Sequence, residues 1–371
     1  VLFRSKMFSD THIVVLAAVK FFHQIGQSIK DAKVNPLSLV IPQIINSLLQ
    51  LALNNQGFND STFCLTAASS LIQAQQDPQF SINLAKYLMT QGMSTALFNS
   101  NDFVGYTFII LEDCVQVAGE KMLCEQELLN SLIDIAIRGF DIQGEYSLLL
   151  LQTICYAIGA NIANYIEILV PKTMSWFQMD LPNSVYVLLC NFIGDISTTI
   201  LDQFKPYANE YIKLILMVIN KPNFTLRERT TVLEVLGDII IGCPDQVSNY
   251  LDSIIKLLQE ISAVKTTSDE PEVIDIVSAL KNASVYIFSA LYQFNTSSSV
   301  YGSIQTCLLF IYATVQDPHF NLMAVHVSKN ICNLLYDVIS IKDSQNIPIL
   351  KSEVMNGNIK KVLTIIAPYL E

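Results

Sequence analysis

The sequence is poor in charge and in the residues that interrupt regular structure. Its 371 residues include only 13 glycines and 12 prolines, and 15% of them are charged, whereas 51% are hydrophobic. So few turn-forming residues argue against a fold of many short strands, and so much apolar surface excludes a chain that is mainly disordered. Alternation typical of strands is nearly absent. The sequence therefore predicts an all-α protein.

The cysteines show no pattern of a metal site or a redox motif. There are eight of them, they are spread singly along the chain, and no pair has zinc-ligand or thiol-exchange spacing. Most lie in apolar helical runs, where a thiol acts as a small hydrophobic group. We therefore expect a reducing compartment, the cytoplasm or the nucleus, rather than a disulfide-stabilised fold.

Nothing in the sequence favours a membrane protein or a leader peptide. Residues 34–59 and 146–166 are long and uncharged, but prolines and amide side chains interrupt them, and an amide is costly in hydrocarbon. No basic segment precedes an apolar core with a cleavage site. The first residue is Val1 rather than Met, so we expect a fragment. The net charge of −11 predicts repulsion of nucleic acid and of anionic membranes, and attraction of basic partners.

The sequence also lacks the motifs of catalysis. No glycine-rich phosphate loop, no Gly-x-Ser-x-Gly turn and no His-Glu-x-x-His helix occurs. The four histidines are His12, His23, His319 and His326, and only the last two fall on one expected helix, without a carboxylate or cysteine at ligand spacing. We expect a protein that is not an enzyme and that holds no metal or cofactor.

What is present is a succession of amphipathic helices with apolar residues spaced by three and four. After a lone helix over residues 10–30, a partial repeat, the helices come in pairs. The expected pairs are 37–54 with 60–76, 80–98 with 103–121, 125–140 with 143–160, 162–178 with 184–203, 207–220 with 226–243, 246–264 with 272–295, and 299–316 with 319–341. A final helix is expected over 358–370, within an irregular end over 342–371.

The pairs recur with a period of about 40 residues, which is typical of HEAT repeats. A single pair cannot bury its own apolar stripe, so neighbouring pairs must stack. The sequence therefore predicts that residues 1–371 form one HEAT-repeat α-solenoid, a right-handed superhelix of about eight to nine repeats of antiparallel helix pairs.

A glycine recurs near the middle or end of the second helix of four successive pairs, as Gly119, Gly159, Gly194 and Gly237. Glycine inside a helix costs about 1 kcal/mol relative to alanine. We expect these glycines to allow close approach of the backbones of stacked repeats.

Residues three before and one after each glycine project from one side of the helix. If the second helices line the concave side, they form an acidic and amide-rich row that suits a basic helix or tail. The alternative is that these residues are solvated or hold a neighbouring loop. The candidate partner-binding residues are Gln116, Glu120, Tyr156, Asn191, Asp195, Glu234 and Asp238.

Residues 187–292 resemble importin beta of the karyopherin family, specifically its C-terminal half. The resemblance is carried by Phe192-Ile193-Gly194-Asp195-Ile196, by Phe204-Lys205-Pro206-Tyr207, by the segment from Thr231 to Ile239, and by the helix from Tyr250 to Gln259. It implies a nuclear transport receptor of the cytoplasm and nucleus. Its implied partners are the basic segment of importin alpha or other basic cargo, and the Phe-Gly repeats of nucleoporins.

The sequence departs from that family in several respects. It has no long acidic loop, and nothing before residue 187 matches the family's Ran-binding repeats, so Ran-GTP binding is expected to be weak for this half. Its one tryptophan, Trp176, falls on a first helix, where a core position is favoured over a surface anchor. The alternative function is a HEAT-repeat scaffold subunit of a phosphatase or coat complex.

Overall fold

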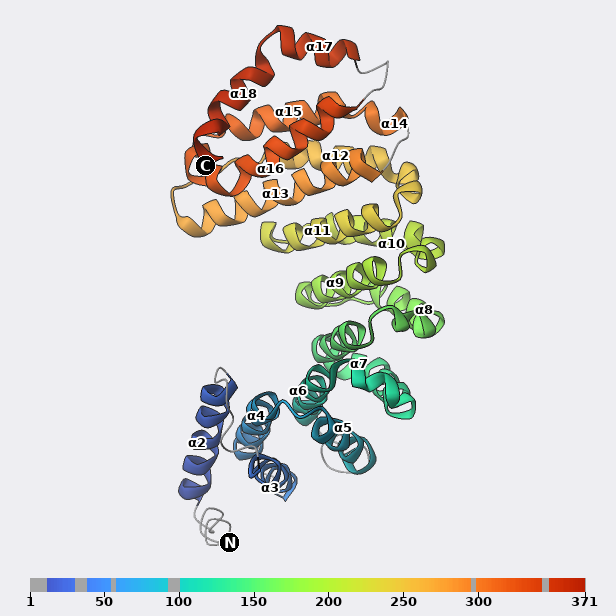
Figure 1. Ribbon diagram of the computed structural model, residues 1–371, viewed down its shortest axis with the longest axis vertical. Coiled ribbons are helices and arrows are strands. Elements are labelled where there is room, and N and C mark those ends of the chain that lie inside the picture. Colours follow the sequence, from blue (N-terminus) through green and yellow to red (C-terminus); the bar gives the residue numbers. More distant parts are fainter. Residues whose placement is uncertain are drawn as a thin grey trace. The chain divides into compact units, whose positions relative to one another are not determined.

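The structure, a computed structural model, describes residues 12–30, 39–54, 58–92, 101–294, 298–341 and 347–370. All regular elements in these ranges are helices, and none of the described residues lies in a strand (Figure 1). The predicted all-α fold is confirmed. The chain divides into two compact units, Val1–Asn164 (unit 1) and Tyr165–Glu371 (unit 2). Whether residues 1–371 make one continuous solenoid stays a prediction.

Unit 1 consists of helices that pair as the apolar spacing predicts. Its helices are α2 (His12–Lys30), α3 (Ile41–Asn54), α4 (Phe58–Gln75), α5 (Pro78–Tyr87, continued by a π-helical turn over Leu88–Gly92), α6 (Asn101–Ala118) and α7 (Gln126–Ile158). The partial first repeat expected over 10–30 corresponds to α2, although residues 10 and 11 lie outside the described ranges. Helix α2 packs against α4, which in turn packs against α6.

Helix α7 is two helices joined at a kink. Gln143 has φ −143° and ψ 66°, which no helix residue adopts, and it lies where the sequence predicts a break between 125–140 and 143–160. Gly144 follows directly and adds conformational freedom to the turn. The two halves of α7 therefore form the third helix pair of unit 1.

Unit 2 continues the same pattern with regular pairs. Its helices are α8 (Ile166–Phe177), α9 (Asn183–Ile200), α10 (Lys205–Ile219), α11 (Leu226–Gly242), α12 (Leu251–Ser262), α13 (Pro271–Phe294), α14 (Ser298–Tyr301), α15 (Ile304–Val315), α16 (Phe320–Ser340), α17 (Ile347–Met355) and α18 (Asn358–Ile366). Helix α18 lies where the final helix over 358–370 is expected, within the irregular end expected over 342–371. Helix α17 was not predicted, and residues 342–346 and 371 lie outside the described ranges.

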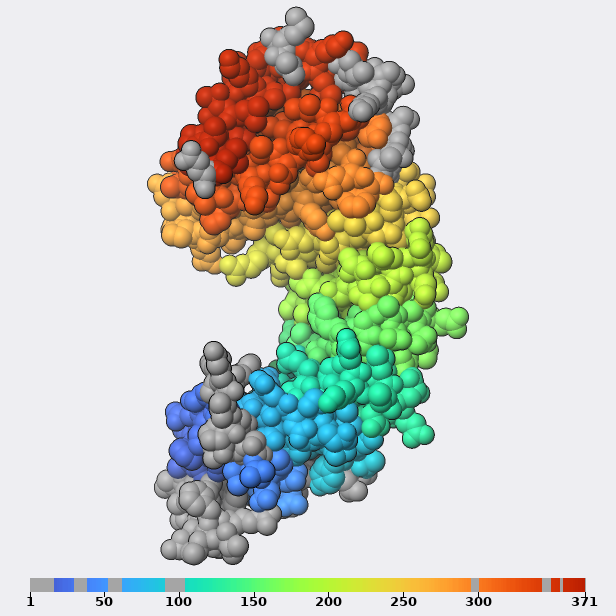
Figure 2. All heavy atoms as spheres, in the orientation of Figure 1, coloured from blue at the N-terminus to red at the C-terminus, as the bar shows by residue number. Residues whose placement is uncertain are grey.

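The helices of unit 2 form two layers. Helices α9, α11, α13 and α16 pack side by side in chain order and are called the second-helix layer; α8, α10, α12 and α15 make up the first-helix layer. The space-filling view shows successive pairs of unit 2 following one another from green to red in chain order (Figure 2). Each pair thus buries the apolar stripe of its neighbour, as a stacked repeat requires.

Aromatic side chains fix one such junction in the first-helix layer. Tyr211 of α10 is fully buried, stacks on Phe204 at 5.3 Å between ring centres, and meets Phe177 of α8 edge-on at 6.3 Å. Its hydroxyl shares a 2.6 Å hydrogen bond with that of Thr173, so no polar atom of the ring is left unpaired. Trp176 is also buried here, which confirms the core position over a surface anchor.

Three helical stretches are long and apolar enough to cross a membrane by length and composition alone. They are Gln126–Phe177, Asn183–Gln203 and Pro271–Phe294. In the last of these, 61% of the most apolar window is buried against other parts of the protein. The apolar surface of α13 is therefore largely used inside the fold.

Candidate partner-binding surface

Two glycines in the second-helix layer bring the predicted acidic residues together. Both Gly194 of α9 and Gly237 of α11 are mid-helix. A methyl group added at Gly194 would lie 3.2 Å from Val235 and 3.6 Å from Oδ2 of Asp238, and one added at Gly237 would lie 2.5 Å from the ring of Tyr286. The space left by each glycine is filled by a side chain of the next helix, not by its backbone as expected.

Helix α11 presents Glu234 and Asp238 one turn apart on the same side. Its start is fixed by a capping box: Thr225 Oγ1 accepts a hydrogen bond from the Glu228 amide at 3.3 Å, and Glu228 Oε2 accepts one from the Thr225 amide at 2.7 Å. Such caps contribute about 1 kcal/mol and set where the helix begins. The buried apolar residues of α11 then set which way the two carboxylates face.

Asp238 lies between two neighbouring helices. Its Oδ1 accepts a 2.7 Å hydrogen bond from the hydroxyl of Tyr286 on α13, and its Oδ2 faces Gly194 on α9, next to Asp195. Tyr286 was not among the predicted site residues. We call Asp195, Glu234 and Asp238 the acidic row.

Burial and neighbouring charge oppose the ionisation of Glu234 and Asp238. Burial, and secondly the charge of Asp238, raises the pKa of Glu234. Burial also raises the pKa of Asp238, the charge of Asp195 adds to this rise, and the hydrogen bond from Tyr286 opposes it. Neither Glu234 nor Asp238 forms an ion pair with any residue that the structure describes. The negative charge of α11 is thus left available to a cation from outside.

The predicted row does not continue into unit 1 with the same geometry. Gly119 and Gly159 each have φ +53°, they end α6 and α7, and a side chain added to either would meet nothing within 4 Å. The expectation that all four glycines share one role is wrong, because two of them terminate helices. Glu120 consequently falls in a 3₁₀ turn over Gly119–Cys124, beyond the end of α6.

The remaining predicted residues are placed as follows. Gln116 is exposed on α6, Tyr156 is 69% exposed near the end of α7, and Asn191 lies one turn before Asp195 on α9 and is half-buried. Of the seven candidates, the structure thus brings Asp195, Glu234 and Asp238 together. Whether any of them binds a partner stays a prediction.

Unit 1 has its own polar contacts between second helices, which the sequence reading missed. Glu112 of α6 accepts a 3.3 Å hydrogen bond from Thr153 of α7, and Asp113 accepts one from Gln73 of α4. Burial, and secondly the charge of Asp113, raises the pKa of Glu112. Glu112 lies four residues before Gln116, so extending the predicted row by one helical turn would have found it.

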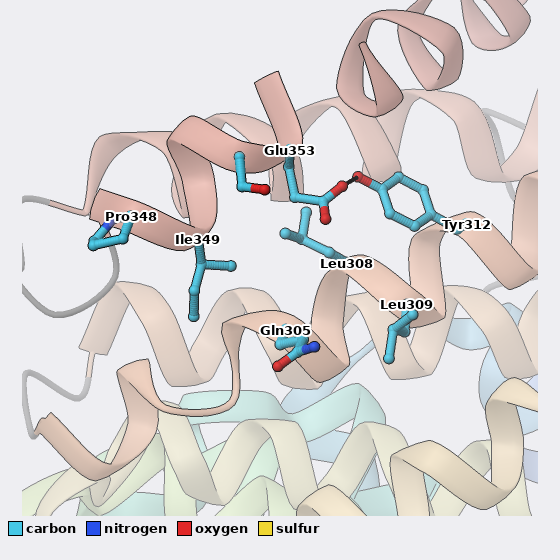
Figure 3. A pocket seen from close by; sticks show the side chains of 8 residues that line it. Gln305, Leu308, Leu309, Tyr312, Pro348, Ile349 and Glu353 are labelled. Atoms are coloured by element: carbon cyan, nitrogen blue, oxygen red, sulfur yellow. Dashed lines mark hydrogen bonds between the residues drawn. The ribbon is translucent and has the colours of Figure 1, made fainter. Parts of the chain in front are cut away.

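The first-helix side of unit 2 carries a groove between α15 and α17. Figure 3 shows Pro348, Ile349 and Glu353 facing the side chains of α15 across it. The groove has a volume of about 350 Å³, and Leu309 within it is 59% exposed. A 2.6 Å hydrogen bond from the Tyr312 hydroxyl to Glu353 Oε2 joins the two helices at one end. We call this the α15–α17 groove.

Side chains of the types that ligate metals do not form a metal site in the described part of the chain. Across those residues, no three histidine, cysteine, aspartate or glutamate side chains gather in a way that could hold a metal ion. His319 instead contacts Asp269, with 3.0 Å between Nε2 and Oδ1.

Comparisons with known proteins agree on one family. Residues 138–362 match the family described as "Importin subunit beta-1-like, TPR repeats". Importin subunit beta-1 of Saccharomyces cerevisiae is 24% identical over 173 residues, which are 45% of this chain and 20% of the relative.

Two solved structures show the likeness of the folds. Importin beta crystallised from polyethylene glycol has a TM-score of 0.74 at 14% identity, over 91% of this chain and 43% of the other. The Kap95:Nup1 complex contains a chain with a TM-score of 0.66 at 16% identity, over 98% of this chain and 46% of the other.

The family match extends on both sides of residues 187–292, where the sequence resemblance is carried. This chain spans less than half the length of the importin-beta chains that it matches. The shared architecture confirms the predicted HEAT-repeat α-solenoid. On the match of residues 138–362, the chain belongs to the importin subunit beta-1-like family.

Proposed function

We propose that this chain is part of a nuclear transport receptor that holds a basic segment of a partner protein against the acidic row. The partner is importin alpha, through its basic segment, or another basic cargo protein, and the receptor works in the cytoplasm and the nucleus. The observation that carries the proposal is the position of the exposed Glu234 and the half-buried Asp238, both without an ion pair among the described residues.

Carboxylates placed in this way oppose folding and favour a cationic ligand. Each loses hydration on burial, and their mutual repulsion adds to that loss. A lysine or arginine side chain would relieve both effects by charge-assisted hydrogen bonds. The net charge of −11 would also speed the approach of a basic partner and would disfavour nucleic acid.

The test measures binding of a peptide from the amino-terminal basic segment of importin alpha at several salt concentrations. Affinity should fall with salt, and the double variant Glu234→Gln/Asp238→Asn should bind at least about tenfold more weakly. The matched control is Asp252→Asn/Glu260→Gln, which removes two exposed charges from α12 in the first-helix layer. Equal affinity of the two double variants would move the site away from the acidic row.

We also propose that the α15–α17 groove takes a phenylalanine side chain of a Phe-Gly nucleoporin. The groove offers exposed apolar surface, and one structural relative, Kap95, has been solved with Nup1. Leu309→Asp should lower the affinity for a Phe-Gly repeat peptide by about tenfold, because a charge would replace the apolar contact. Leu322→Asp, an exposed leucine of α16 in the second-helix layer, is the control and should bind normally.

Ran binding stays a prediction for this chain. Kap95p has been solved with RanGDP, and its chain shares the fold at a TM-score of 0.69 and 17% identity. That likeness concerns the fold alone, so it does not place a Ran site on residues 1–371.

A further inference from the structure

We propose that a groove between α13 and α16 binds an extended peptide segment, with an apolar side chain of the peptide in the groove and a neighbouring lysine or arginine at Asp238 and Glu234. The proposal rests on the function proposed above and specifies its partner. It requires a basic segment that also carries an apolar anchor, rather than basic charge alone.

The groove has an apolar floor open to solvent. Val285 and Ala290 of α13 are buried beneath it, Ile241 of α11 lines it on one side, and Phe294, 45% exposed, lies at the end of α13. Its volume is about 270 Å³. Pockets for whole small molecules usually measure about 300–1,000 Å³ and enclose their ligand, so this open groove suits one or two side chains of a larger partner.

Amide side chains form the rim of the groove. Asn330 donates a 3.0 Å hydrogen bond to Asn282 Oδ1, and Asn282 donates one of 3.1 Å to the His326 carbonyl, so these two hold each other in place. Gln293 donates to Asp337 at 3.0 Å, which leaves its own oxygen as an acceptor. Asn333 is exposed and forms no hydrogen bond with a described residue, so it offers both a donor and an acceptor.

This rim favours an extended segment over a helix. A helix satisfies its own backbone amides and carbonyls, whereas an extended chain presents both to its surroundings. The oxygens of Asn330 and Gln293, for which the described residues supply no donor, and the amide of Asn333 match those backbone groups. Neutral amides would not by themselves select a charged ligand.

Charge selection comes from the part of the groove at Tyr286. The ring of Tyr286 lines the groove, and its hydroxyl donates to Asp238 Oδ1 at 2.7 Å. Ile241 lies one helical turn after Asp238 on the same side of α11. The groove and the acidic row therefore share Tyr286 and α11, which places an apolar anchor and a cationic side chain of one short segment within reach of both.

The experiment uses four fluorescently labelled synthetic peptides: a leucine or an alanine followed by a run of arginines, and the same two with glutamines in place of the arginines. Binding to the whole chain is measured by fluorescence anisotropy at low salt. The leucine–arginine peptide should bind about tenfold more tightly than the alanine–arginine peptide, the difference expected for burial of one leucine side chain. The glutamine peptides should bind much more weakly.

Variants of the groove locate the effect. Phe294→Ser should remove most of the advantage of the leucine peptide, and Asn333→Ala should weaken both arginine peptides, because they share the backbone that Asn333 contacts. Asn321→Ala, an exposed amide at the other end of α16, should change neither. If leucine and alanine peptides bind equally but Glu234→Gln/Asp238→Asn still weakens both, the groove inference falls and the proposed function stands. If no arginine peptide binds at low salt, both fall.

Discussion

Two charged regions of unit 2 differ in whether the fold supplies a partner for their charge. Lys281 of α13 is only 1% exposed, and its ammonium donates to the carbonyls of Ile261 and Ser262 at 2.9 and 3.2 Å. Glu234 and Asp238 of α11 are partly exposed and have no cation partner among the described residues. The first charge is satisfied within the fold and the second is not. Lys281 therefore has its partners within the fold, whereas the proposed binding role of the acidic row would give the carboxylates a partner from outside.

The position of Lys281 explains why its charge is tolerated. Ile261 and Ser262 are the last residues of α12, where unpaired carbonyls and the helix dipole favour a cation. Burial lowers the pKa of Lys281 to about 8, and the charge of Asp317 opposes this. Asp317 also accepts a 3.0 Å hydrogen bond from the backbone of Thr266, so the segment after α12 is fixed at two points.

The largest expected effect is the loss of this satisfied charge. Lys281→Ala should lower the free energy of unfolding by about 3 kcal/mol, because it removes the lysine donor to the Ser262 carbonyl and one of the two donors to the Ile261 carbonyl, and it leaves a cavity where the side chain lay. Lys256→Ala, an exposed lysine of α12, is the control and should change stability by less than about 0.5 kcal/mol. Urea denaturation measures both. Equal effects of the two would remove the contrast between the regions.

Stability as a function of pH measures what burial of the charged form of Lys281 costs. The pKa of Lys281 is about 8 in the folded protein, against 10.5 as its ordinary value, so the unfolded chain binds more protons between these two pH values. The contribution of Lys281 to the free energy of unfolding therefore rises from pH 8 toward 10.5 and is lost as pH falls through 8. Lys281→Ala should show a smaller rise than the natural chain over this window.

A smaller effect is expected where Gly237 accommodates Tyr286. Gly237→Ala should cost about 1–2 kcal/mol of stability and should weaken binding at the acidic row, because the added methyl group would displace the Tyr286 ring from Asp238. In a Tyr286→Ala background the same change should cost nothing or should stabilise, since alanine favours the helix and the clash is gone. An unchanged cost in that background would mean that the ring is not the obstacle.

The sequence predicts the helices of this protein better than the contacts between them. Glu234 and Asp238 were found because a spacing of four on one helix is visible in the sequence. Tyr286 was missed because it lies on another helix than Asp238, 48 residues further along the chain. That contact depends on the rotation of α11 and α13 about their own axes. Apolar spacing shows only which broad face of a helix is buried, so it does not define that rotation closely enough.

The glycines show a second limit. All four recur at similar spacing, yet Gly194 and Gly237 make room for side chains, whereas Gly119 and Gly159 end helices at φ +53°. Spacing does not reveal a backbone angle. Helix α17 was missed because it has only nine residues and carries Pro348 in its first turn. A proline at the start of so short a segment is equally typical of a turn.

The smallest effect, and the one of opposite sign, is expected at the acidic row. Burial raises the pKa of Glu234 and Asp238 above their ordinary values of 4.5 and 3.8, so the folded protein binds protons more tightly than the unfolded chain just above those values. Stability is therefore lost as pH rises through this window. Glu234→Gln/Asp238→Asn should consequently be slightly more stable than the natural chain at pH 7, by less than about 1 kcal/mol.

The hydrogen bond from Tyr286 need not be lost in that variant, because an asparagine oxygen still accepts it. Urea denaturation at pH 7 and at the lowest pH where the chain stays folded should show the gain shrinking as the natural carboxylates become protonated. Asp252→Asn/Glu260→Gln should show no such gain. A net loss of stability at neutral pH would mean that the two charges support the fold, and the contrast with Lys281 would disappear.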